Sequence, residues 1–276
     1  SASSIGEGEG EGEGEGEGVA GEGEGEGGAT DQETEPNNGA TVDEVNDVAA
    51  GDVVDGAVDP AGDIDIFRVA TTPGDVYRVT LSAEDASTID GHITVLDAGR
   101  GGNAAGNDYV RLERAPDGAG ASIAFVAFGV GGDLVGVRDA RDVDGTPTGG
   151  ATATYSIAIV DDGPASSQAT AIEFPTTIDD ALDDVGGVKL YAFDANEGAD
   201  FTVDLQAHGD LDARLFVFSV DQGDWVARND DRAQDDANPL LDAFFPVGGP
   251  MLIVVESAAE SATDLSYTLS TTGNAP

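Results

Sequence analysis

Acidic and amide side chains with the spacing of a cation site occur in two short segments near the start of the folded part of the chain. Segments 33–38 and 63–65 together supply four carboxylates and two carboxamides, from Glu33, Glu35, Asn37, Asn38, Asp63 and Asp65. Alternate side chains of an extended segment share one face, so the acids of each segment can point the same way. Ca²⁺ takes about six to eight hard oxygen ligands in proteins. The spacing therefore predicts a calcium site between an entry segment and a core strand; a solvated acidic edge is the alternative.

The second of these segments recurs later in the chain without its acids. Residues 62–69 return 124 positions downstream as residues 186–193, with Gly187 in place of Asp63 and Lys189 in place of Asp65. Lys189 is the only lysine of the chain. We expect its ammonium group to supply the positive charge that calcium supplies in the first copy; a chance surface lysine is the alternative.

The elements that must position these residues are short strands. Alternating or continuous apolar residues predict strands at 76–81, 93–96 and 154–159, and the uniformly apolar segment 123–128 is typical of a strand buried on both faces. No segment of helical length has an apolar stripe, and 42–50 offers at most one or two helical turns. Many short strands separated by Gly, Asp, Asn and Pro indicate an antiparallel sandwich or barrel.

The repeat extends through these strands and keeps the same side chains on the same face. At the offset of 124, Tyr77 matches Phe201, and Val79 matches Val203. A match that preserves side-chain parity predicts the same buried face in both copies. We therefore expect two copies of one β-domain, at residues 31–161 and 162–276, behind a tail at residues 1–30.

The entry motif and the first core strand together resemble the bacterial pre-peptidase C-terminal domain, whose relatives include the collagen-binding domains of clostridial collagenases. The similar motifs are Glu-Thr-Glu-Pro-Asn-Asn at 33–38 and Gly-Asp-Ile-Asp-Ile-Phe at 62–67, and the second copy adds 210–212 and 229–231. The resemblance spans about 33–160 and 162–272. It implies jelly-roll-like β-sandwiches that are not catalytic, are appended to secreted or surface proteins, and in several cases bind calcium. Asn38 departs from the family's usual Asp.

The predicted fold class is thus all-β, with two tandem antiparallel jelly-roll-like sandwiches behind a low-complexity Gly-Glu tail. Residues 6–28 contain nine glutamates and no base. One interpretation is a solvated tether, because like charges repel and glycine is entropically costly to order. The other is a strand with glutamates on one side and bare glycine on the other, ordered by a neighbouring subunit. The second interpretation predicts self-association through the tail.

Charge and composition exclude several classes of partner. A formal net charge of −44 argues against nucleic-acid binding through phosphate neutralisation and against docking on anionic membranes. No apolar run approaches the ~20 residues of a membrane span. Self-repulsion must be screened or neutralised by cations, which favours high salt or a calcium-rich exterior. Because the chain starts with Ser1 rather than Met, we expect a processed protein that is extracellular or at the cell surface.

Catalysis is not expected. Cys is absent, and the two imidazoles, His92 and His208, are predicted to be ordinary surface residues. A second acidic group in the later copy is explained by Asx-rich turns, with a metal as the alternative. It comprises Asp210, Asp212, Asn229, Asp230 and Asp231, and its partial counterpart is Asp90, Asn103, Asn107 and Asp108.

These observations predict a non-enzymatic, calcium-stabilised structural protein that is a subunit of an extracellular filament or surface layer. The alternative is an accessory module of a secreted hydrolase or lipoprotein, which would hold its partner to an extracellular polymer.

Overall fold

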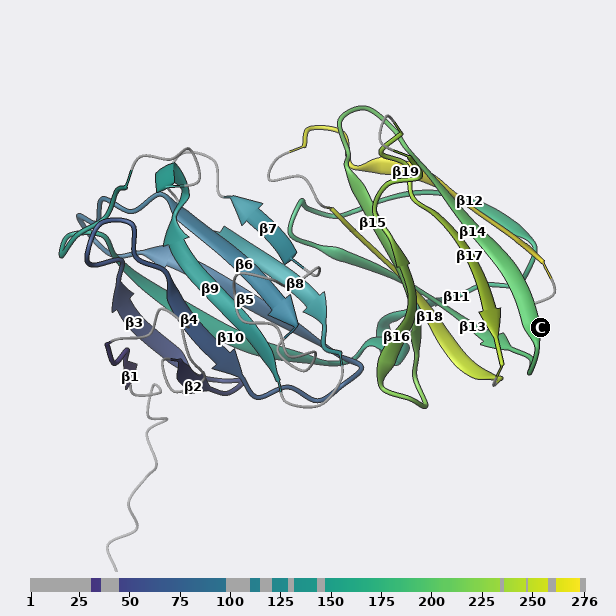
Figure 1. The fold of residues 1–276 in the computed structure, drawn as a ribbon, viewed down its shortest axis with the longest axis horizontal. Helices are drawn as coiled ribbons and strands as arrows, with labels where there is room; N and C mark the ends of the chain where they lie inside the picture. The colour runs from purple at the N-terminus through teal and green to yellow at the C-terminus, as the bar shows by residue number, and fades with distance from the viewer. Residues whose placement is uncertain are drawn as a thin grey trace, which may run out of the picture.

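The computed structural model confirms the all-β class and shows strands packed into two sandwiches (Figure 1). It describes residues 31–35, 45–97, 110–114, 121–128, 132–142, 147–233, 236–246, 248–257 and 262–273. The predicted tail at residues 1–30 lies outside the described residues, as do Asn37 and Asn38.

Two five-stranded sheets form the first sandwich. Sheet A has the order β1 (Asp31–Gln32), β3 (Val53–Ala57), β10 (Thr154–Pro164), β5 (Asp75–Ala83) and β8 (Ala121–Val126). Sheet B has the order β2 (Asn46–Val48), β4 (Asp65–Val69), β9 (Asp133–Asp139), β6 (Gly91–Asp97) and β7 (Val110–Arg114). A 3-10 helix, η3, covers Ala140–Asp142.

The second sandwich repeats this arrangement. Sheet C has the order β11 (Thr170–Ala171), β13 (Val188–Ala195), β18 (Gly249–Ser257), β15 (Ala213–Ser219) and β16 (Asp224–Asn229). Sheet D has the order β12 (Thr176–Ala181), β19 (Ser266–Gly273), β14 (Ala199–Ala207) and β17 (Leu240–Phe245). The single described α-helix, α1, covers Ala165–Gln168.

Alternation along each strand builds the two cores. In β5, Tyr77, Val79 and Leu81 point inward and are buried, while the residues between them face outward. Their repeat counterparts in β14 are buried in the same way in the second core. The strand pairing also keeps register, because Val79 pairs with Ile123 and its counterpart Val203 pairs with Leu241. Burial of one face of each strand thus specifies the strand register in both sandwiches.

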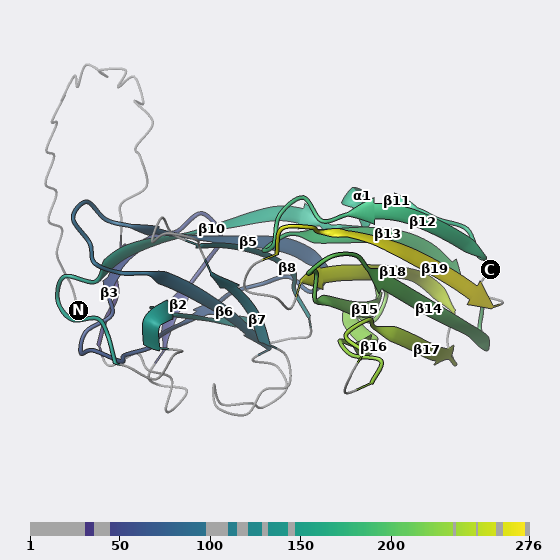
Figure 2. The same cartoon turned by 90° about the horizontal axis from the view of Figure 1, so that it is seen from above.

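A third apolar cluster joins the two sandwiches, which we call the junction. It consists of Val76, Val126, Phe128, Ala165, Leu190, Phe216, Phe218, Leu252 and Val254, all buried. The first three lie on the outer face and end of sheet A, and the last five on the outer face of sheet C. Figure 2 shows β8 beside the second sandwich. The predicted strand at 123–128 is therefore buried on both faces, one in the core and one in the junction.

No separate linker lies between the sandwiches. β10 runs to Pro164 and is followed at once by α1, and the amide of Ala165 donates to the carbonyl of Gly74 at 2.9 Å. The predicted boundary between residues 161 and 162 falls inside this strand. A further amide-to-carbonyl hydrogen bond, from Ala124 to Gly186 at 2.6 Å, ties β8 to the loop before β13.

The sequence allowed at most one or two helical turns at 42–50, and the described part of that segment, 45–50, contains no helix. Residues 46–48 form β2, which pairs in parallel with Phe67–Val69 of β4. Val48 lies in the first core. The backbone gains its hydrogen bonds from the neighbouring strand, which overrides a weak local preference for helix.

Candidate cation site

Glu33 enters the site from sheet A. The chain leaves β1 at Gln32 and continues along β3, where the amide of Glu33 donates to the carbonyl of Asp55 at 3.1 Å. Its carboxylate folds over the end of β3, and Oε1 accepts a hydrogen bond from the amide of Ala57 at 2.5 Å. Strand pairing and this contact hold Glu33 against the edge of the core.

Asp65 enters from sheet B, as the first residue of β4, and is fully buried. The hydroxyl of Tyr155, on β10 of the facing sheet, lies 2.6 Å from Asp65 Oδ2 and 2.9 Å from Glu33 Oε2. One hydroxyl proton can be donated to only one of these carboxylates at a time. Tyr155 therefore bridges two acids without neutralising them.

The acids converge. One carboxylate oxygen from each of Glu33, Glu35 and Asp65 lies within 4.8 Å of the other two. Asp65 Oδ1 is buried and has no hydrogen-bond partner, which is a costly state for a carboxylate oxygen. The arrangement offers hard oxygens, at close spacing, to a cation.

The electrostatics agree with this geometry. Burial raises the pKa of the Asp65 carboxyl to about 8, and the charge of Glu33 adds to the effect despite the hydrogen bond from Tyr155. Burial and the same two carboxylates raise the pKa of the Tyr155 hydroxyl. The Asp65 carboxyl therefore resists ionisation unless a positive charge offsets its burial.

Gly56 makes room for the site. It pairs with Tyr155 across β3 and β10. A Cβ at this position would lie 2.5 Å from Tyr155 Cζ and 2.7 Å from Glu33 Oε2. Any side chain here would force the tyrosine or the glutamate out of place.

The structure brings together three of the six predicted ligands. Asp63 stands outside the converging group: it is half-buried, and its Oδ1 accepts from the amide of Ile64 at 3.0 Å. Burial raises the pKa of its carboxyl, and its charge in turn raises the pKa of Asp65. Sequence reasoning missed Tyr155 and Gly56. Tyr155 could have been found, because an inward tyrosine in a predicted strand needs a partner for its hydroxyl.

The second sandwich has a different polar centre at the equivalent place. Tyr267 pairs with Asp180 as Tyr155 pairs with Gly56, and Lys189 is the repeat counterpart of Asp65. Lys189 Nζ lies 3.2 Å from Asp180 Oδ1. The Tyr191 hydroxyl donates to Asp180 Oδ2 at 2.8 Å, and the hydroxyls of Tyr191 and Tyr267 lie 2.7 Å apart.

An acid and a base thus occupy the positions held in the first sandwich by a glycine and an unneutralised acid. Burial acts to raise the pKa of the Asp180 carboxyl, but hydrogen bonds from the Ala181 amide, Tyr191 and Lys189 outweigh it and lower that pKa. The second centre is therefore satisfied by the chain's own charges.

The second predicted acidic group does not converge in this way. Asp210 accepts hydrogen bonds from the amides of Thr263 and Asp264, both at 3.0 Å, which tie it to a loop distant in the sequence. Asp230 lies 3.9 Å from Arg214, and burial with the charge of Asp231 raises the pKa of Asp212. Asn103, Asn107 and Asp108 lie outside the described residues.

The expectation of a surface position is wrong for His92, which is fully buried. It faces outward from β6, but Arg138 on the adjacent strand β9 lies over it, and Arg138 Nε donates to His92 Nδ1 at 2.9 Å. His208 is exposed, 3.2 Å from Thr268 Oγ1.

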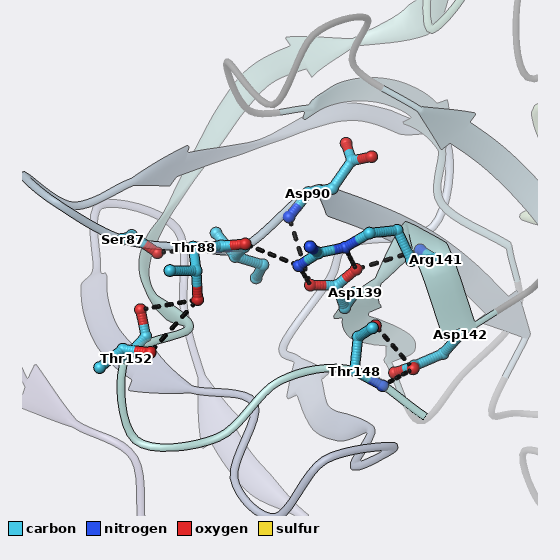
Figure 3. Close-up of polar contacts among 9 residues, drawn as sticks. Ser87, Thr88, Asp90, Asp139, Arg141, Asp142, Thr148 and Thr152 are labelled. Carbon is cyan, nitrogen blue, oxygen red and sulfur yellow. Dashed lines mark hydrogen bonds and ion pairs between the residues drawn. The ribbon is translucent and has the colours of Figure 1, made fainter. Parts of the chain in front are cut away.

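Another acid is satisfied internally, at the end of β9 (Figure 3). Arg141 Nε donates to the buried carboxylate of Asp139 at 2.8 Å, and Arg141 Nη2 donates to the carbonyl of Thr88 at 2.7 Å. Burial acts to raise the pKa of Asp139, but its hydrogen bonds with Arg141 lower it. This network pins η3 to the loop before β6, and the Asp139 carboxylate is neutralised by Arg141, so we regard it as structural.

A cavity of about 330 Å³ opens on the second sandwich and is lined by Arg214, Arg228, Asn229 and Asp230. The Arg228 guanidinium lies 5.0 Å from the centre of the Trp225 ring. Trp225 is partly buried and packs against the junction.

Among the described residues, no helix is both long and apolar enough to cross a membrane.

No protein-family model matches this chain, and no curated protein matches it. Solved structures with similarity include the pre-peptidase C-terminal domain of collagenase from Bacillus anthracis, with 14% identity, 37% of this chain and 93% of that chain covered, and a TM-score of 0.32. A periplasmic inhibitor of g-type lysozyme from Aeromonas hydrophila has 18% identity, coverages of 38% and 96%, and a TM-score of 0.31. The tandem CBM51 modules of a family 98 glycoside hydrolase from Streptococcus pneumoniae have 11% identity, coverages of 77% and 81%, and a TM-score of 0.26. At identities and TM-scores this low, they assign no ligand, role or partner to any residue here.

Proposed function

We propose that this chain is a non-enzymatic extracellular structural protein whose first sandwich is stabilised by a calcium ion held by Glu33, Glu35 and Asp65. The observation that carries the proposal is the buried Asp65 carboxylate, with one unpartnered oxygen, beside two further carboxylates. Ca²⁺ suits this set because the ligand atoms are all hard oxygens. Asp63, Asn37 and Asn38 remain proposed as further ligands.

The second sandwich supports the proposal as an internal comparison. Where Asp65 is replaced by Lys189, the chain also supplies Asp180 as its counterion. Both sandwiches thus have a carboxylate at this place. In the second sandwich a lysine neutralises it, and in the first no base among the described residues is seen to do so, which indicates that a positive charge is needed there. In the first sandwich, the bound ion supplies that charge.

Isothermal titration calorimetry with calcium tests the proposal directly. We expect one site for the intact chain and loss of binding in Asp65→Asn, which keeps the shape of the side chain and removes its charge. Asp194→Asn is the matched control, since Asp194 is an exposed acid of the second sandwich. Two equal sites, or unchanged binding in Asp65→Asn, would contradict the proposal.

We further propose that copies of the chain assemble into a filament or surface layer, in high salt or in millimolar calcium. The net charge of −44 supports the need for screening, because unscreened copies repel. The Gly-Glu tail is proposed to pair with a neighbouring subunit. Electron microscopy with calcium and with chelator separates filaments and sheets from single particles, and single particles in both conditions would count against assembly.

The second candidate function is an accessory binding module that holds a secreted enzyme or lipoprotein to a polymer. The cavity lined by Arg214, Arg228, Asn229 and Asp230 favours it, because convergent donors and acceptors beside an aromatic ring suit a polar ligand.

A further inference from the structure

Each half of the junction between the two sandwiches has a counterpart on the outer face of another sheet. The register of the strands identifies the equivalent positions. Val76 pairs with Val126 in sheet A, and Asp200 pairs with Phe244 in sheet D, where Asp200 is the repeat counterpart of Val76. Val126, which is buried in the junction, thus corresponds to Phe244.

Phe244 is 65% exposed, the most exposed large apolar side chain among the described residues. It points outward from β17, which is the edge strand of sheet D. Its inward neighbours, Leu241, Ala243 and Phe245, lie in the core. The second sandwich therefore presents an aromatic ring where the first sandwich presents its buried contact to sheet C. We call Phe244 and Asp200 the donor patch.

The opposite surface of the junction also recurs. In sheet C, Leu190 and Leu252 receive the first sandwich. Phe67 pairs with Val135 as Tyr191 pairs with Ile253, so the counterparts of Leu190 and Leu252 are Ile66 and Leu134 on the outer face of sheet B. Those two side chains form a separate small apolar cluster with Val45.

Two more members enlarge this surface. Ile64, the counterpart of Val188, is 37% exposed. A Cβ at Gly136 would lie 3.3 Å from Ile66, 3.8 Å from Ile64 and 3.8 Å from Thr94, so these side chains gather at one place. Ile66 and Leu134 are buried, at 1% and 8% exposure, so we call the partly exposed Ile64, Thr94 and Arg68 on the same face the acceptor patch.

The charges at the two patches are complementary. On the donor side, the apolar Val76 is replaced by Asp200, and on the acceptor side, the repeat counterpart of Ala192 is Arg68. An acid and a base thus appear where the junction has two apolar residues. Arg68 is already paired with the exposed Asp47 at 3.0 Å, so it is held on this face.

We propose that the donor patch of one copy docks on the acceptor patch of the next, repeating between molecules the contact that the junction makes within one. The proposal rests on the assembly part of the proposed function and names its interface. The donor patch lies on β14 and β17 of the second sandwich, and the acceptor patch lies on β4, its preceding residue and β6 of the first; Figure 1 shows these strands. Such a head-to-tail contact is heterologous, so it propagates into rings or filaments.

Sedimentation velocity of single-site variants of the full chain tests this proposal, in high salt and with calcium. Phe244→Asp inactivates the donor patch, and Thr94→Glu inactivates the acceptor patch. Each variant alone is expected to lose self-association, with an apparent Kd at least ~10-fold weaker, about 1.4 kcal/mol. Val160→Asp is the control, because Val160 is 47% exposed but belongs to neither patch.

Mixing the two variants gives the decisive outcome. Each retains one intact patch, so the mixture is expected to form a one-to-one complex and nothing larger. Thermal melting of each variant establishes that it folds. A wild-type chain that stays monomeric at high concentration in both conditions, self-association that survives Phe244→Asp, or no complex in the mixture would overturn the proposal. Calcium binding is measured separately, so loss of the metal site and loss of this interface are distinguishable.

Discussion

At Asp65 the first sandwich differs in charge from its duplicate, which has Lys189 at the equivalent position. Asp65 is buried between two sheets, shares a tyrosine hydroxyl with Glu33, and leaves one oxygen without a partner. A buried carboxylate in this state destabilises the fold unless a proton or a cation neutralises it.

The first prediction concerns pH in the presence of chelator. The folded-state pKa of Asp65, about 8, lies above the ordinary value of 3.8, so between these limits the folded state binds a proton that the unfolded state has released. Stability without metal therefore falls as pH rises from about 4 to about 8, by up to about 1.4 kcal/mol per unit. Denaturant unfolding across this range checks it.

Asp65→Asn is the control for this trend, since an amide does not titrate. Its unfolding free energy in chelator is expected to vary less with pH than that of the wild type. Saturating calcium should also flatten the wild-type trend, because the bound ion favours the ionised carboxylate. If the unfolding free energy of the wild type rises with pH in chelator, the prediction for Asp65 is contradicted.

The convergence of three acids was partly predictable at this scale. The two-residue spacing placed Glu33 and Glu35 on one side of an entry segment, and Asp65 at the mouth of a strand. It could not separate Asp65 from Asp63, because parity gives both the same face while the depth of each depends on where the strand begins. Gly56 could not be predicted, since its role is the space that it leaves for Tyr155.

At the scale of elements, the two sandwiches place polar side chains in the same region of the core from different pairs of strands. In the first, β4 and β10 bring together an acid and a tyrosine. In the second, β12 and β13 bring together Asp180 and Lys189, with Tyr191 beside them. The order of the equivalent strands is the same in both copies, but Asp65 and Gly56 of the first are replaced by Lys189 and Asp180 in the second.

The second prediction tests this exchange with Lys189→Met, which keeps the length of the side chain and removes its charge. Asp180 would then be left beside two tyrosines without a counterion. Because both side chains are partly exposed, we expect a loss of roughly 1–2 kcal/mol of unfolding free energy. Chemical denaturation measures the loss, which should be the same with calcium and with chelator; unchanged stability would make Lys189 a chance surface residue.

Periodicity and the repeat predicted β4, β5, β6, β8 and β10 with the counterparts β13 and β14, but not β9 or β18, for example. The junction shows one limit of such reasoning. Alternation predicts which side chains face outward, but it does not say what covers them. The apolar segment 123–128 indicated burial on both faces without naming the second sandwich as the cover. Residues 46–48 were missed as a strand because three residues are too few for periodicity, and their partner β4 lies some twenty residues away.

At the scale of the whole molecule, the junction makes one body of two domains. Phe128 packs against Phe216 and Phe218, with ring centres 5.6 Å apart in both pairs. The rings are buried and come from both sandwiches. Unfolding of either sandwich exposes this surface, so their stabilities are coupled.

The third prediction is that Phe128→Ala uncouples them. Truncation of a buried phenylalanine lowers the unfolding free energy by about 3–5 kcal/mol. At Phe128 the lost packing is between the two sandwiches. Differential scanning calorimetry is expected to show two resolved transitions in the variant. Chelator is expected to lower the melting temperature of the first sandwich only. Val160→Ala is the control, because that side chain is 47% exposed and lies outside the junction. Two transitions already resolved in the wild type, with no change in Phe128→Ala, would show that the junction carries no coupling.

The position of Glu33 has a mechanical consequence. Thirty residues precede β1, so a pulling force applied through them enters the fold along a two-residue strand that runs parallel to β3. Two residues of parallel pairing resist shear weakly. The next attachment along the chain is the Glu33 carboxylate, bonded to Ala57 and Tyr155. An ion bound there would link the entering chain to both sheets. The force needed to detach that segment would then depend on the ions in the surrounding medium.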